Sequence, residues 1–178
     1  MGVDALAIVD RDGTIVESVR ATDGSVTSAF APEQLRFLPG VVEGLLVLQA
    51  GYRLAIATNQ PGAAKGQATR AAIERTNAAL VAMLAAEGIT IARVEVCLHH
   101  PVGGPGGEAA LVGPCECRKP APGMALALLA RFGADPARSW MIGDSAVDEA
   151  AGRAAGLRTA LVGSATLLDI AKQIMGID

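Results

Sequence analysis

The stretch that decides the fold is ALAIVDRDGT, residues 5–14, in which five apolar residues run directly into two aspartates and a glycine. An unbroken apolar run of this length is typical of a strand that is buried on both faces of a parallel sheet. Gly13 permits a tight turn after the strand. Asp10 and Asp12 are therefore expected on one loop at the carboxyl end of that strand, where open α/β sheets bind their ligands.

The rest of the chain repeats the alternation of short apolar runs with helical patterns. Apolar runs predict further strands at 54–57, 94–96, 140–142 and 159–162, and helical patterns lie at 41–50, 69–87, 124–132, 148–155 and 167–175. Within the second helix, Ile73, Leu80 and Leu84 recur at helical spacing. This order predicts right-handed crossovers and a doubly wound, Rossmann-like parallel sheet. Residues 17–39 and 101–122 are rich in turn residues and are expected to be loops.

Length and composition set further limits. The 178 residues, 51% of them hydrophobic, predict a single domain over 1–178. No stretch approaches the roughly 20 apolar residues that cross a bilayer, and residues 1–6 lack a basic region and a cleavage site, so we expect a cytoplasmic protein. A net charge of −3 argues against nucleic-acid binding and favours a small soluble ligand. The compact size suggests a monomer.

Polar side chains follow several of the predicted strands. Because the carboxyl ends of parallel strands meet at one edge of the sheet, these residues are expected to converge although they are far apart in the sequence. They are Asp10, Asp12, Thr58, Asn59 and Asp144.

The pair Asp10 and Asp12 suits phosphoryl transfer to a carboxylate. Asp10 would attack phosphorus as the ionised nucleophile, and Asp12 would protonate the leaving oxygen and later take a proton from water. The alternative is an ordinary surface turn, since Asp and Gly are common turn residues. The position directly after a buried strand favours the site.

Two further segments supply groups that suit a phosphate. Thr58, Asn59 and Gln60 follow the second strand, where a hydroxyl, an amide and backbone N–H groups can hold phosphate oxygens; the alternative is helix capping. Lys119, which follows Arg118, would place a fixed positive charge beside the nucleophile, and a solvated surface lysine is the alternative.

The segment GDSAVD, residues 143–148, ends the fourth predicted strand with two carboxylates four residues apart. That spacing lets both face the same side as a helix begins. Asp144 suits Mg²⁺, which favours hard oxygen ligands, and Asp10 with the Asp12 carbonyl and the phosphate would complete the shell. Asp148 is assigned a supporting role.

The three cysteines lie within a short segment, and their odd number argues against a disulfide framework. A closed, structural Zn²⁺ site with four ligands is predicted from Cys97, His99, Cys115 and Cys117. The ion would hold the two ends of the segment 97–117 together, and we call this segment the zinc loop. The second cysteine pair adjoins Arg118 and Lys119, so folding the loop would also position the lysine. Two alternatives stay open: buried unbonded cysteines, and His100 in place of His99.

The four motifs, each after its predicted strand, resemble those of the haloacid dehalogenase-like phosphatase superfamily from Asp10 to about Val162. The resemblance implies that Asp10 is the nucleophile and Asp12 the acid/base. It also implies that Thr58 and Lys119 handle the phosphate and that Asp144 binds Mg²⁺.

Within that superfamily, DRDGT (10–14), TNQPG (58–62), CLHHP (97–101) and CECRKPAPGM (115–124) look similar to the subfamily of D-glycero-D-manno-heptose 1,7-bisphosphate 7-phosphatases and histidinol-phosphate phosphatases. Members are compact and lack a large cap domain. The likeness implies that Arg118 and the zinc loop frame a small phosphorylated substrate, and it favours the heptose bisphosphate.

The chain departs from this pattern at Ser145, where the heptose enzymes carry lysine, and at Pro61 and Lys65, where serine and arginine are usual. Two other functions are weighed. One is the same chemistry on histidinol phosphate or another small phosphomonoester, and the other is a catalytically silent binding domain on the same scaffold. The second predicts the loss of a residue needed for chemistry, yet Asp10, Asp12, Lys119 and Asp144 are all present.

Overall fold

The computed structural model describes residues 5–20 and 24–177 and is built around a parallel sheet of five strands in the order β5-β4-β1-β6-β7. The strands are β1 Leu6–Val9, β4 Arg53–Asn59, β5 Ile91–Cys97, β6 Trp140–Gly143 and β7 Arg158–Leu161. The predicted doubly wound sheet is confirmed. Since β1 lies between β4 and β6, the strand order reverses beside β1. In open α/β sheets, ligands bind in the crevice that such a reversal leaves beyond the carboxyl ends of the strands.

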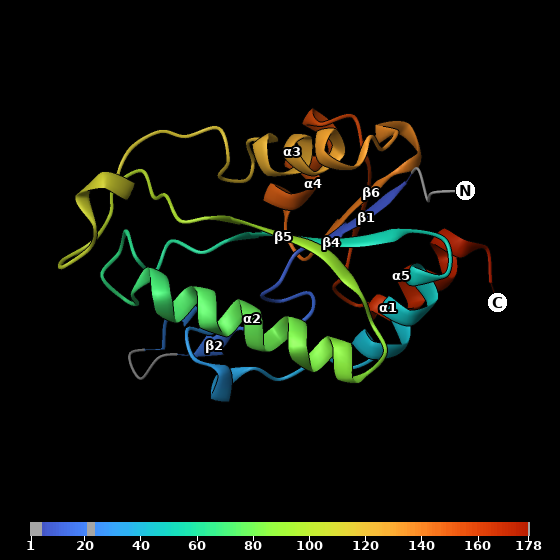
Figure 1. Cartoon of the computed structure of the whole chain (residues 1–178), viewed down its shortest axis with the longest axis horizontal. Coiled ribbons are helices and arrows are strands. Elements are labelled where there is room, and N and C mark those ends of the chain that lie inside the picture. The colour runs from blue at the N-terminus through green and yellow to red at the C-terminus, as the bar shows by residue number, and fades with distance from the viewer. Residues whose placement is uncertain (1–4, 21–23, 178) are drawn as a thin grey trace.

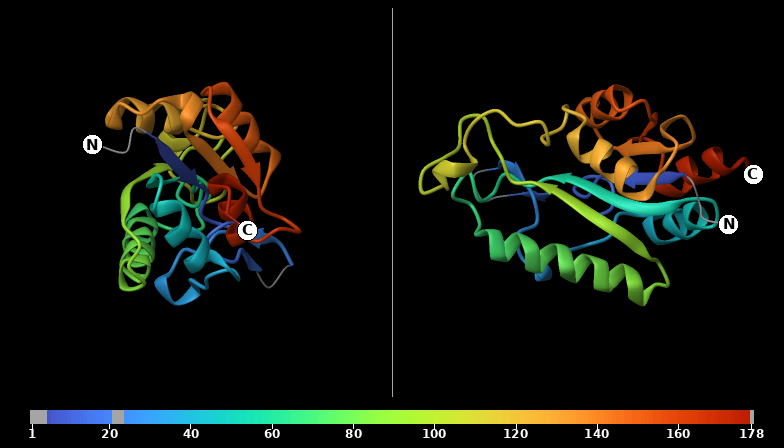
Figure 2. Two further views of the ribbon diagram at one scale, coloured as in Figure 1. Left: turned by 90° about the vertical axis from the view of Figure 1, so that its right-hand side faces the viewer. Right: turned by 45° about the horizontal axis from the view of Figure 1, so that its top comes forward.

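Helices cover both faces of the sheet. They are α1 Val41–Gln49, α2 Arg70–Ala86, α3 Gly123–Phe132, α4 Ala146–Ala154 and α5 Leu167–Met175, each within two residues of its predicted bounds. In Figure 1, α3 and α4 lie above the sheet and α1, α2 and α5 below it, and Figure 2 shows the same layers from other sides. No helix in the described part of the chain is long and apolar enough to cross a bilayer.

Alternate residues of β1 supply the two halves of the core. Ala7 and Val9 pack in the cluster that includes α1, α2 and α5, whereas Leu6 and Ile8 pack in the cluster that includes α3. Every residue of β1 is therefore buried, as its unbroken apolar sequence predicts. The loop that follows therefore starts from the buried central strand of the sheet.

Two expectations about local structure are wrong. The outer strands β5 and β7 are only partly buried, because each pairs with one neighbour and is an edge of the sheet. Residues 17–39 hold a small antiparallel pair, β2 Val19–Arg20 with β3 Val26–Thr27, and a 3₁₀ turn. Two-residue strands are too short to produce a periodic sequence signal.

Candidate active site

The loop after β1 carries the two predicted catalytic carboxylates. The Asp10 N–H donates to the Ile142 carbonyl of β6 at 2.9 Å, which fixes the start of the loop at the end of the sheet. Asp10 is 8% exposed. Asp10 and Asp12 both line a small cavity of about 110 Å³, together with Thr58, Asn59 and Lys119, so the predicted convergence at this edge is real.

Lys119 is buried against two carboxylates. Its Nζ lies 2.7 Å from Asp10 Oδ1 and 2.5 Å from Asp148 Oδ1, and it also donates to the Ala57 carbonyl at 2.8 Å. The three acceptors match the three N–H groups of an ammonium, so the charge is fixed in place. The alternative of a solvated surface lysine is wrong, since only 4% of the residue is exposed.

The carboxylates of the site crowd one another. Burial, opposed by Lys119 and reinforced by Asp148, raises the pKa of Asp10 to about 6. Burial and then the neighbouring charge of Asp148 also raise the pKa of Asp144. Both shifts mean that the ionised carboxylates are unfavourable here, mainly because they are buried and secondly because Asp148 lies near them, and a divalent cation would relieve both effects.

Three carboxylates are close enough to share such a cation. Oxygens of Asp10, Asp144 and Asp148 all lie within 4.8 Å of one another. Asp148 is the least suited of the three, because its Oδ1 meets Lys119 and its Oδ2 accepts from the Ser145 hydroxyl at 2.6 Å. Asp10 and Asp144 therefore fit a hard cation, and Asp148 supports the lysine.

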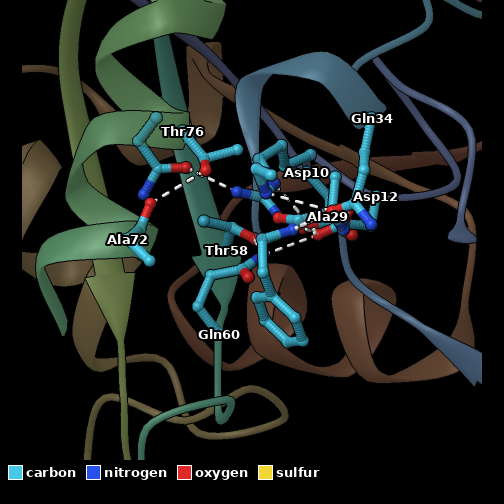
Figure 3. Close-up of polar contacts among 12 residues, drawn as sticks. Asp10, Asp12, Ala29, Gln34, Thr58, Gln60, Ala72 and Thr76 are labelled. Carbon is cyan, nitrogen blue, oxygen red and sulfur yellow. Dashed lines mark hydrogen bonds and ion pairs between the residues drawn. The ribbon is translucent and has the colours of Figure 1, made fainter. Parts of the chain in front are cut away.

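Two of the predicted phosphate-binding side chains brace other site residues. Asn59 donates to the Lys119 carbonyl at 3.0 Å and accepts from the Lys119 N–H at 3.0 Å, so it fixes the backbone of the lysine. The Gln60 amide donates to Asp12 Oδ2 at 2.6 Å and to the Thr58 hydroxyl at 2.9 Å. Figure 3 shows Gln60 and Thr58 beside the Asp10–Asp12 loop.

A larger cavity of about 260 Å³ adjoins the small one, and Asp12, Ser28 and Asn59 line both. Arg118 and Lys65 line only the larger cavity. The Arg118 guanidinium is anchored by a hydrogen bond to the His99 carbonyl at 3.2 Å, within the predicted zinc loop. A ligand with one end over Asp10 can thus meet two cations at its other end.

The predicted zinc ligands come together. Their ligand atoms, the sulfurs of Cys97, Cys115 and Cys117 and a ring nitrogen of His99, lie within 4.8 Å of one another. The three sulfur–sulfur distances are 3.0, 3.5 and 3.7 Å. A tetrahedral ion with Zn–S bonds of about 2.3 Å holds its sulfurs roughly 3.8 Å apart, so the cluster fits zinc with little adjustment. Burial, then the hydrogen bond with Cys117, raises the pKa of Cys97, which is unfavourable for a thiolate that has no cation.

His100 is not the histidine of this cluster. Its Nδ1 accepts from the Val102 and Gly103 N–H groups at 3.3 and 3.0 Å, and it stabilises the turn that follows. His99 Nδ1 instead lies 3.5 Å from the Cys117 sulfur. The structure therefore favours His99 over the alternative that the sequence left open.

The sequence interpretation assigned no role to Arg11 or Asn77. Arg11 is fully buried, and its Nη1 donates to Asn77 Oδ1 of α2 at 2.7 Å. Asn77 had a detectable signal, because it lies on the buried stripe of α2 between Ile73 and Leu80. A polar residue on an apolar helix face requires a partner inside the protein.

Comparison with known proteins gives one consistent family. A family model described as HAD-hydrolase-like matches residues 116–170. A Pseudomonas aeruginosa protein named D-glycero-β-D-manno-heptose-1,7-bisphosphate 7-phosphatase is 34% identical over 160 residues, covering 89% of this chain and 80% of that protein. A Rhodopseudomonas palustris protein of the same name is 38% identical over 152 residues, covering 85% and 79%.

The fold comparison agrees. The crystal structure of D,D-heptose 1,7-bisphosphate phosphatase from B. bronchiseptica, complexed with magnesium and phosphate, superposes with a TM-score of 0.73 at 25% identity. The match covers 97% of this chain and 98% of that one.

Proposed function

The chain belongs to the haloacid dehalogenase-like hydrolases, in the family of the heptose-1,7-bisphosphate 7-phosphatases, and we propose on this basis that it removes the 7-phosphate of D-glycero-β-D-manno-heptose 1,7-bisphosphate. The observation that carries the proposal is the pairing of Asp10 with the buried Lys119 beside a cavity lined by two further cations. The whole chain, 1–178, acts in this proposal as one catalytic unit.

The reaction follows from the positions of Asp10 and Asp12. Asp10 attacks phosphorus, the bond from phosphorus to the sugar oxygen breaks, and Asp12 gives its proton to that oxygen. The resulting Asp12 carboxylate takes a proton from water, whose oxygen attacks phosphorus and breaks its bond to Asp10. Phosphate leaves and Asp12 is protonated again. Lys119, fixed by Asp10 and Asp148, stays beside the transferred group as a positive charge.

The donor set supports a magnesium requirement. Asp10, Asp144 and the carbonyl of Asp12 would hold Mg²⁺, which prefers oxygen ligands. When bound, the ion would offset the repulsion between the carboxylates and the incoming phosphate.

The larger cavity supports a bisphosphate over a monoester. Lys65 and Arg118 line it, and they are well placed to receive the second phosphate while the first lies over Asp10. Histidinol phosphate would bring an ammonium group toward the same two cations, which is unfavourable. We therefore place the sugar bisphosphate ahead of histidinol phosphate.

The zinc loop has a structural part in this proposal. A closed set of Cys97, His99, Cys115 and Cys117 leaves no ligand position for water, and Arg118 follows directly in the chain. The three free thiols must stay reduced to bind zinc, which supports action in the cytoplasm. We also propose that the enzyme acts as a monomer.

The test is phosphate release in the presence of Mg²⁺ from both anomers of the heptose bisphosphate, from histidinol phosphate and from simple sugar phosphates. We expect selective hydrolysis of the β-bisphosphate. Lys65→Met and Arg118→Met should each raise KM for the bisphosphate by about tenfold or more while sparing simple monoesters, and Arg75→Met, which removes an exposed charge from α2, should not. Preference for another ester would refute the substrate, and no release from any ester would refute the activity.

A further inference from the structure

Arg11 lies between the two catalytic aspartates in sequence, yet it points away from solvent. It is 0% exposed and is among the largest fully buried side chains in the described protein. A buried guanidinium is strongly unfavourable unless its N–H groups and its charge are met. Its partners therefore indicate why the chain keeps an arginine here.

The partners of Arg11 lead to Asp12. Nε donates to Asp12 Oδ2 at 3.0 Å and Nη2 to Asp12 Oδ1 at 3.1 Å, which is the two-pronged geometry of an arginine–carboxylate pair. Nη2 also donates to the Ala29 carbonyl at 2.8 Å. On its far side, Nη1 donates to Asn77 of α2 at 2.7 Å, so the guanidinium is held from behind by a helix.

Asp12 receives two more hydrogen bonds from other segments. Gln60 donates to Oδ2 at 2.6 Å and the Ala29 N–H donates to Oδ1 at 3.2 Å. Figure 3 shows Asp12 with Ala29 and Gln60 around it. Hydrogen-bond donors from three separate segments, at Arg11, Ala29 and Gln60, therefore select one orientation of the Asp12 side chain. This side chain is 14% exposed and lines both cavities.

From this geometry we propose that Arg11 and Gln60, with Asn77 acting through Arg11, are positioning residues that hold the Asp12 carboxyl group in reach of the leaving oxygen and of the attacking water. The inference rests on the proposed phosphatase activity. Proton transfer requires heavy atoms about 2.6–3.2 Å apart. A shift of about 1 Å can slow a reaction on the order of 100-fold.

The choice of substrate separates positioning from general stability. An alkyl phosphate needs the Asp12 proton when its oxygen leaves, whereas p-nitrophenolate leaves without one. Hydrolysis of the phosphorylated Asp10 needs Asp12 for either substrate. Misplacing Asp12 should therefore spare the first step with p-nitrophenyl phosphate and slow the second.

The experiment is rapid-mixing kinetics of Arg11→Lys, Asn77→Ala and Gln60→Leu, each checked for native folding by circular dichroism. With p-nitrophenyl phosphate we expect a burst of about one nitrophenolate per enzyme, followed by turnover at least tenfold slower than in the natural protein. Turnover of the heptose bisphosphate, which is an alkyl phosphate, should fall about 10- to 100-fold. Arg153→Lys makes the same exchange in an exposed ion pair with Glu149 and should change neither.

Asp12→Asn supplies the reference. It should show the same burst, and adding Arg11→Lys to it should cause less than a twofold further loss. The inference would be overturned if phosphorylation and dephosphorylation of Asp10 slowed equally and no burst appeared. It would also be overturned if Arg11→Lys lowered turnover in the Asp12→Asn background as much as it does in the natural protein. If Arg11→Lys does not fold, Asn77→Ala and Gln60→Leu decide. Failure of the natural protein on both the heptose bisphosphate and p-nitrophenyl phosphate would instead refute the phosphatase activity.

Discussion

Gly13→Ala tests whether the loop after β1 and Asp144 form one metal site. A Cβ added to Gly13 would lie 2.2 Å from Asp144 Oδ2 and 2.8 Å from its Cγ. Ordinary contact begins at 3.4 Å, so the carboxylate must withdraw by about 1.2 Å. A carboxylate can rotate away easily, but Mg²⁺ demands oxygens at about 2.0–2.1 Å. We expect the affinity for Mg²⁺ to fall about 10- to 100-fold, as for other disturbed ligands.

The backbone contributes a second effect that a control must remove. Gly13 has φ +80°, where a side chain costs about 1–2 kcal/mol. Gly88 has φ +81° and nothing within 4 Å of an added Cβ, so Gly88→Ala carries the backbone cost without the collision. Mg²⁺ titration of phosphate release and of thermal stability should separate the two variants. Equal Mg²⁺ dependence in Gly13→Ala and the natural protein would refute the argument.

Three other substitutions test separate parts of the site. Asp10→Asn should abolish phosphate release and yet stabilise the metal-free protein at pH 7.5. The reason is that a folded-state pKa of about 6, against an ordinary value of 3.8, makes the ionised form unfavourable by up to about 3 kcal/mol. The gain should fade as the pH falls from about 6 to about 4, because Asp10 of the natural protein is protonated in the folded state below the first value and in the unfolded state below the second. A melting temperature that does not rise at pH 7.5 would contradict this. Cys115→Ser should lower zinc content and thermal stability before it affects turnover, and full zinc occupancy by elemental analysis would count against the ligand set. Asp148→Asn should lower kcat at least tenfold by removing one anion from Lys119. Asp169→Asn is the control, because Asp169 caps the start of α5 from the same position as Asp148 caps α4, and it should lose only helix stability. Equal kcat in both variants would reject the role of Asp148.

The fold was accessible from the sequence because local and global signals agree along most of the chain. The unbroken run at 5–9 and the helical stripe on 70–86 each produce a pattern long enough to read. Edge exposure of β5 and β7 was not accessible, because strand order depends on how distant segments pair. The short strands in 17–39 were missed since their pairing is set by neighbours rather than by periodicity.

The sequence was enough to predict which residues form the site, but not which hydrogen bonds they make. Asp10, Asp12 and Asp144 could be recognised because each follows a strand at one edge of the sheet, and Lys119 because its motif resembles that of the haloacid dehalogenase-like phosphatases. Which atom meets which partner could not, since Asn59 looks equally suited to phosphate or to a backbone. Hydrogen-bond partners are chosen by distances of a few tenths of an ångström, and a linear sequence carries no such information.

The net charge of the site and the uncharged side chain of Ser145 together bear on how strongly the protein depends on Mg²⁺. Four carboxylates, those of Asp10, Asp12, Asp144 and Asp148, gather here, and the cations among them are Arg11 and Lys119. The excess of two negative charges opposes a dianionic phosphate, and a lysine at position 145 would halve it.

In this chain Ser145 instead donates to Asp148 at 2.6 Å and adds no charge. A divalent ion must then supply all of the missing positive charge before a phosphate can bind. Ser145→Lys should therefore relax the Mg²⁺ concentration needed for half-maximal phosphate release by several-fold. An unchanged Mg²⁺ requirement in that variant would show that charge balance does not control metal dependence here.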